Sequence, residues 1–120
     1  MRSHKASLDW EEQLRRGGLE LAVMLSVAGE PRYGLEIIHQ LEELTDLVVT
    51  EGTIYPLLAR LTRDGLLAAD WNEEAAHPRK YYRLTAGGRR ELASMSAHWQ
   101  NFSRKIDRLI EIAARQGRLG

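Results

Sequence analysis

The feature that most constrains this fold is a regular run of apolar residues near the C-terminus. Its members are separated alternately by three and four positions: Leu92, Met95, Trp99, Phe102, Ile106, Leu109 and Ala113. This spacing places one apolar seam along a helix over three heptads, as in a coiled coil. Thr85 is a suitable N-cap, so the pattern predicts a single helix from Thr85 to about Arg115.

So long an apolar seam needs a partner surface. A chain of 120 residues cannot bury both sides of this helix in its own core. We therefore predict a homodimer in which the first and last helices of two chains pack together. Its interface would comprise Leu14, Leu92, Met95, Trp99, Phe102, Ile106 and Leu109. The alternative is that the seam packs only on the first helix of its own chain.

Composition excludes several other classes of protein. No apolar run approaches the ~20 residues that a membrane span needs, and no apolar segment follows the N-terminus, so we expect a cytoplasmic protein. The chain has no cysteine, which excludes disulfides and thiolate metal sites. Its four histidines lack metal-ligand spacing, so no metal or cofactor is expected. No group of side chains suggests a catalytic centre, and we expect no enzyme.

Residues 50–67, "TEGTIYPLLARLTRDGLL", predict a second kind of helix. Thr50 is a plausible N-cap and Gly65 a plausible C-terminal stop. One face carries the apolar stripe of Ile54, Leu57, Leu58 and Leu61. The opposite face is low in profile and is flanked by hydrogen-bond donors; it comprises Gly52, Pro56, Ala59 and Arg63, with Thr53, Tyr55 and Arg60 at its edges. This face suits close approach to another surface, although a solvated face remains an alternative.

Charge is unevenly distributed although the formal net charge is zero. Residues 33–59 contain no Lys or Arg, whereas residues 77–90 contain five basic residues and no acidic one. A local basic strip beside a low-profile helix is what a phosphate backbone requires.

The order of the remaining elements defines the predicted fold. A first helix is expected from residue 8 or 9 to 28, a turn at 29–34 and a second helix at 33–45. Two strands, 66–71 and 79–84, should form a hairpin around a loop at 72–78. The inward residues of the two helices would be Trp10, Leu14, Leu21, Leu25, Leu35, Ile37, Ile38, Leu41 and Leu44. The predicted fold is mainly α with a small β-hairpin: a winged helix-turn-helix at 1–84, followed by a C-terminal dimerisation helix at 85–120.

Three segments resemble the PadR family of bacterial transcriptional regulators. They are "YGLEI" at 33–37, "GTIYPLLARLTRDGLL" at 52–67 and "PRKYYRLTAGG" at 78–88, in the order and spacing of that family. The single helix after the hairpin is similar to the shorter PadR type. The resemblance implies a homodimer that represses by covering a promoter, with double-stranded DNA as its partner.

The resemblance also implies roles for individual residues. Tyr33 would contact a phosphate, Thr53, Tyr55 and Pro56 would lie at the DNA face of the third helix, and Arg79 and Lys80 would lie at the wing. Arg60 and Arg63 would reach phosphates farther along, and a two-fold dimer would match an inverted-repeat operator.

Two alternatives stay open. Trp99, with Trp10, Met95 and Phe102, either fills space in the interface or forms a slot for a small aromatic effector. The whole chain is either a DNA-binding regulator or a winged-helix protein-interaction module without specific DNA binding. The basic wing at Arg79 and Lys80 is the feature that discriminates between the last two.

Overall fold

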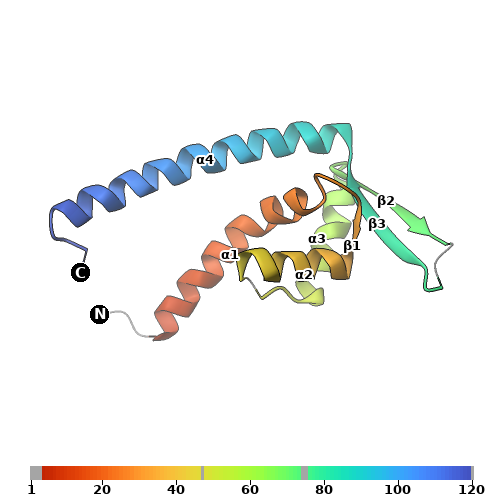
Figure 1. Cartoon of the computed structure of the whole chain (residues 1–120), viewed down its shortest axis with the longest axis horizontal. Helices are drawn as coiled ribbons and strands as arrows, with labels where there is room; N and C mark the ends of the chain where they lie inside the picture. Colours follow the sequence, from red (N-terminus) through yellow and green to blue (C-terminus); the bar gives the residue numbers. More distant parts are fainter. Residues whose placement is uncertain (1–3, 47, 74–75, 120) are drawn as a thin grey trace.

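The computed structural model describes residues 4–46, 48–73 and 76–119. Its elements are α1 (His4–Ser26), β1 (Arg32–Tyr33), α2 (Gly34–Thr45), α3 (Glu51–Arg63), β2 (Leu67–Asn72), β3 (Arg79–Leu84) and α4 (Ala86–Arg115). Helices α1 to α3 pack beside a small antiparallel sheet with the strand order β1-β3-β2, and α4 runs outward from the sheet (Figure 1). This arrangement confirms the predicted fold class of helices with a β-hairpin wing.

The core lies between α1, α2, α3 and the inner face of the sheet. Its most deeply buried side chains are Val23, Met24, Val27, Ile37, Ile54, Leu58, Leu61 and Leu67. Leu21, Ile38 and Leu41 are also buried, as the sequence predicted.

Five residues that we expected to face this core are exposed instead: Trp10, Leu14, Leu25, Leu35 and Leu44. In α1 the buried stripe is formed by Leu19, Val23 and Met24, which share one side of the helix, and Val27, just past its end, is buried too. The helix therefore has a second apolar stripe, which includes Trp10 and Leu14 and is exposed. The sequence prediction took this stripe to be the buried one.

Several element boundaries also differ from the prediction. Helix α2 begins at Gly34 rather than 33, and β2 spans Leu67–Asn72 rather than 66–71. Helix α1 begins at His4 rather than residue 8 or 9 and ends at Ser26 rather than 28. The expected turn at 29–34 contains β1, whose two residues pair with Tyr81 and Tyr82 of β3. So short a strand has no periodicity to reveal it. The predicted hairpin loop includes residues 74 and 75, which lie outside the described residues.

The hairpin alternates as predicted. Tyr82 and Leu84 are buried on its inner face, while Tyr81 and Arg83 lie on the other. Helix α3 contains Pro56 without interruption and ends at Arg63. The predicted stop, Gly65, lies just past the C-cap Asp64 and adopts a positive φ of 79°.

Hydrogen bonds at its N-terminus fix helix α4 to the turn between α3 and β2. The Thr85 hydroxyl donates to the carbonyl of Gly65 at 2.6 Å and accepts from the Gly88 N–H at 2.9 Å. Met95 is the last residue of the helix that packs against the core, and the C-terminal part of α4 extends away from the sheet (Figure 1). The radius of gyration is consequently 17.5 Å, whereas a compact chain of this length would have about 14 Å.

Candidate functional site

The outward side of α3 is the low-profile face that the sequence predicted. Gly52, Pro56, Ala59 and Arg63 are all exposed, while Ile54, Leu58 and Leu61 are buried behind them. The main chain of α3 is thus accessible along most of its outer side, and Thr53 and Tyr55 stand exposed at its edges.

Tyr55 joins this face to the start of α2. Its ring lies on the backbone of Gly34, where a Cβ would come within 2.5 Å of Tyr55 Cε1. The first turn of α2 is fixed by Glu36, whose carboxylate accepts the Tyr33 N–H at 3.1 Å. The absence of a side chain at Gly34 therefore determines where the Tyr55 hydroxyl lies.

The wing is held to the same place through aromatic contacts. The Arg79 guanidinium lies 4.3 Å from the centroid of the Tyr33 ring, within cation–π distance. Tyr33 also meets the edge of Tyr81, with centroids 5.5 Å apart and planes inclined by 77°. Arg79 is therefore positioned beside α2 rather than extended freely from the wing.

Lys80 leaves the strand on the opposite face from Arg79. Its Nζ lies 5.8 Å from the centroid of the Tyr82 ring, and Lys80 pairs in register with Trp71. Burial raises the pKa of the Tyr82 phenol, and the nearby Tyr55 raises that pKa further. A hollow of about 350 Å³ separates the wing from α2 and α3, and its walls include Tyr33, Tyr55, Trp71, Arg79, Lys80 and Tyr82.

The two arginines of α3 differ in their surroundings. Arg60 pairs with Glu20 of α1 at 3.3 Å and with Asp64 at 3.8 Å, so its charge is partly compensated. Arg63 is exposed and takes part in none of the ion pairs between described residues. The structure thus brings Tyr33, Tyr55, Arg79 and Lys80 around one hollow and leaves Arg60 at the opposite edge of α3, facing α1.

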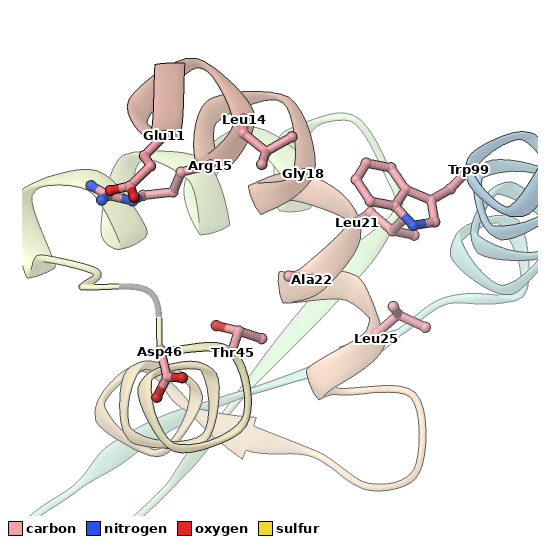
Figure 2. Close-up of a pocket in the computed structure, with 10 residues that line it drawn as sticks. All are labelled: Glu11, Leu14, Arg15, Gly18, Leu21, Ala22, Leu25, Thr45, Asp46 and Trp99. Atoms are coloured by element: carbon pink, nitrogen blue, oxygen red, sulfur yellow. The ribbon is translucent and has the colours of Figure 1, made fainter. Parts of the chain in front are cut away.

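A second hollow, of about 510 Å³, lies between α1, the end of α2 and α4 (Figure 2). Trp99 reaches from α4 toward α1, and its Cη2 lies 3.7 Å from the place that a Cβ on Gly18 would occupy. The other walls include Leu14, Leu21 and Leu25, with Glu11 and Arg15 at one end. Of the four residues predicted for a ligand slot, Trp99 lines this hollow, whereas Trp10, Met95 and Phe102 are not among its lining residues.

The seam of α4 divides into two parts. Leu92 is buried and Met95 packs partly buried against the core. Farther along, Trp99, Phe102, Ile106 and Leu109 are each between 38% and 63% exposed. Exposed Trp10 and Leu14 lie on α1.

Within the described ranges, no cluster of three potential metal-ligating side chains occurs. No described helix is both long and apolar enough to cross a membrane. His39 and His98 are exposed on helix surfaces.

Three helices followed by a hairpin, with the low face of the third helix beside a basic wing, define a winged helix-turn-helix protein. Residues 23–94 match the Transcriptional regulator PadR-like family. The chain therefore belongs to the PadR family of transcriptional regulators, as the three sequence segments indicated.

Two solved structures and one further relative agree with this assignment. A PadR family transcriptional regulator from Eggerthella lenta is 34% identical, with a TM-score of 0.80 over 89% of this chain and 94% of that chain. A PadR-like transcription factor from Bacteroides fragilis is 40% identical, with a TM-score of 0.70 over 84% of this chain and 98% of that one. A transcriptional regulator of Mycobacterium tuberculosis is 27% identical over 94 residues, covering 78% of this chain and 87% of that protein.

Proposed function

We propose that this protein is a cytoplasmic homodimer that binds an inverted-repeat operator in double-stranded DNA and represses transcription. The observation that best supports this function is the basic wing beside the low face of α3. A B-DNA major groove, about 12 Å wide, admits one α-helix. Small residues such as Gly52 and Ala59 would let the main chain of α3 approach the bases closely.

Each exposed residue of this surface has a chemical role in the proposal. Thr53 and Tyr55 would donate hydrogen bonds to base edges or phosphates, and Pro56 would pack in the groove. Tyr33, Arg63, Arg79 and Lys80 would contact phosphates, which position the protein without reading sequence. Arg60 would contribute less, because Glu20 and Asp64 already share its charge.

The proposed dimer rests on the exposed part of the α4 seam together with Leu14. Residues 85–120 would then form the dimerisation helix and residues 1–84 the DNA-binding domain. Ile106→Glu should yield a monomer in analytical ultracentrifugation, because it would bury a charge in the interface. Ala97→Glu, on the opposite side of α4, is the matched control and should stay dimeric. A dimeric Ile106→Glu protein would refute this interface.

We also propose that a small aromatic ligand binds beside Trp99 and releases the operator. The apolar walls of the 510 Å³ hollow and the exposed indole support this proposal. In a dimer, Met95, Phe102 and Trp10 would add to the slot. Planar dyes should quench tryptophan fluorescence in the unmodified protein and not in Trp99→Ala. A varied panel of compounds that causes no quenching would contradict the ligand proposal.

The decisive experiment measures binding to the DNA immediately upstream of the protein's own gene. The protein is titrated against this fragment and a scrambled fragment at two salt concentrations. Preferential, saturable binding by two protomers per site is the expected result. Equal and salt-sensitive binding to both fragments would instead indicate a phosphate-seeking surface without specificity. Charge reversal at Arg79 and Lys80 should abolish DNA binding. No effect of this reversal on nucleic acid would favour the alternative function of a protein-interaction module.

A further inference from the structure

The wing carries a large apolar side chain that the sequence analysis left without a function. Trp71, near the end of β2, is 61% exposed. It continues the alternation of Leu67 and Ala69, yet it lies beyond the core that those residues reach. A solvent-facing indole at the end of a hairpin contributes little to folding, and tryptophan is enriched at binding interfaces.

The strand register determines which way this indole faces. Trp71 is directly paired with Lys80, so the two side chains leave the hairpin on the same face. Tyr82 and Leu84 occupy that face too, and both are buried against the helices. Trp71 and Lys80 therefore extend the inner face of the hairpin past the core, and both line the hollow that Tyr55 of α3 bounds on its other side.

The cations of the hairpin differ in their partners. On the outer face, Arg79 lies over the Tyr33 ring. On the same face, Arg83 pairs with Asp70 at 3.0 Å, which compensates its charge. None of the ion pairs between described residues includes Lys80. The inner face thus offers an uncompensated ammonium group beside an exposed apolar ring, next to the outward face of α3.

We infer that Trp71 is a DNA-contact residue. Its indole packs against a deoxyribose, and Lys80 binds a phosphate of the same DNA strand. A sugar with its phosphate combines apolar C–H groups and a negative charge, which matches this pair of side chains. Because the wing lies to one side of α3, the contact falls on DNA flanking the bases that α3 reads. The inference rests on the proposed function. It adds Trp71 to the DNA-binding residues and the flanking DNA to the contacted site.

The test uses the full chain labelled with 5-fluorotryptophan, which gives one fluorine NMR signal for each of its three tryptophans. The signal missing from Trp71→Phe identifies Trp71. The probe is a duplex that the unmodified protein selects from a random-sequence pool. A second duplex is the same sequence shortened at both ends, so that it keeps the bases that α3 reads and lacks the flanking DNA. The Trp71 signal should shift with the long duplex and not with the short one.

Affinities measured on both duplexes complete the test. Trp71→Ala should bind the long duplex about five- to tenfold more weakly, as aromatic contacts with nucleic acids suggest, and Trp71→Phe should recover most of this loss. Lys80→Gln should weaken binding, whereas the matched Arg83→Gln, on the outer face, should not.

Three outcomes would overturn the inference. Tight binding of the long duplex by Trp71→Ala, together with a Trp71 signal of the unmodified protein that the long duplex does not shift, would leave the proposed function intact but remove Trp71 from the interface. A Trp71 signal that moves with protein concentration alone would place it in a contact between copies of the chain. Selection of no duplex would remove the proposed function and this inference together.

Discussion

The ring of Tyr55 rests on the backbone of Gly34, so closely that a methyl group at residue 34 would lie 2.5 Å from Tyr55 Cε1. This contact joins the start of α2 to the outward edge of α3. The same end of α2 is joined to the wing, because Tyr33 carries the Arg79 guanidinium 4.3 Å from its ring centroid. The start of α2, the outward edge of α3 and the wing are the three parts of the proposed DNA surface. Contacts at Tyr33 and Gly34 therefore fix their relative positions.

Gly34→Ala should weaken operator binding while leaving the protein folded. The added methyl group would displace the Tyr55 ring, which is 41% exposed and free to turn toward solvent. An off-rotamer side chain costs about 0.5–1.5 kcal/mol, so only a small loss of stability is expected. Operator affinity, measured by fluorescence anisotropy, should fall as far as it does in Tyr55→Ala.

The matched control is Gly17→Ala in α1, where a Cβ would meet nothing within 4 Å. Alanine favours a helix interior over glycine by about 0.5–1 kcal/mol, so this variant should be more stable and bind the operator normally. If Gly34→Ala bound the operator as tightly as the unmodified protein, the position of Tyr55 would have no part in recognition.

Gly87 and Gly88 are adjacent at the start of α4, and substitution by alanine should have different effects on stability at the two positions. A Cβ on Gly88 would overlap the backbone carbonyl oxygen of Leu66, which cannot move aside as a flexible side chain does. We expect Gly88→Ala to lose about 1–3 kcal/mol or more in the free energy of unfolding. A Cβ on Gly87 would make only ordinary contacts, the nearest at 3.7 Å from Thr85 Oγ1.

Urea unfolding followed by circular dichroism would measure both variants. Gly87→Ala should equal or exceed the stability of the unmodified protein, because alanine favours the helix. Equal stability of the two variants would mean that α4 does not sit against the turn between α3 and β2 as described.

Arg63→Ala and Arg60→Ala should differ in how salt affects operator binding. An arginine that neutralises one phosphate contributes close to one unit to the slope of log affinity against log salt. Arg63 is exposed without an ion-pair partner among the described residues, so its loss should reduce the slope by about one unit. Arg60 already pairs with Glu20 and Asp64, so its loss should change the slope less.

Loss of the Arg60 ion pairs should also have a small effect on the free energy of unfolding. Both acidic partners of Arg60 are more than one-third exposed, so solvent weakens the pairs and their loss should cost at most about 1 kcal/mol. A larger change of slope in Arg60→Ala than in Arg63→Ala would mean that Arg60, and not Arg63, makes the phosphate contact.

How far the sequence alone predicted this molecule depended on whether a pattern was local. Capping and periodicity are local, and so Thr50, Gly65 and Thr85 correctly marked helix ends. Burial depends on what packs against each face. Helix α1 has two apolar stripes, and nothing local distinguished the buried one at Val23 and Met24 from the exposed one at Trp10 and Leu14.

The site was predictable to a similar extent. The sequence grouped Arg79 with Lys80 as wing cations, but consecutive strand residues face opposite sides, and only the fold shows Arg79 on Tyr33 and Lys80 near Tyr82. The fold also revealed the pairing of Arg60 with Glu20, which lies 40 positions away in the chain. Trp71 was assigned to a strand, and its exposure became evident only when the extent of the core was known.

Tyr82 should make the fold sensitive to alkaline pH. Its side chain is buried, and burial, aided by Tyr55, raises the pKa of the phenol above its ordinary value of 10.0. In the unfolded chain the phenol would lose its proton near that ordinary value, before the folded protein does. The stability that this group contributes is therefore fully present below pH about 10 and is lost as the pH rises through the folded pKa.

Denaturant unfolding of the unmodified protein and Tyr82→Phe, from about pH 8 to about pH 11, would isolate this effect. The free energy of unfolding of the unmodified protein should fall more steeply, by up to about 1.4 kcal/mol per pH unit between the two pKa values. Phenylalanine keeps the buried ring and removes the ionisable group, so other alkaline titrations cancel in the difference. Parallel curves would mean that the Tyr82 phenol ionises as readily in the folded protein as in the unfolded chain, and that its face of the hairpin is open to water.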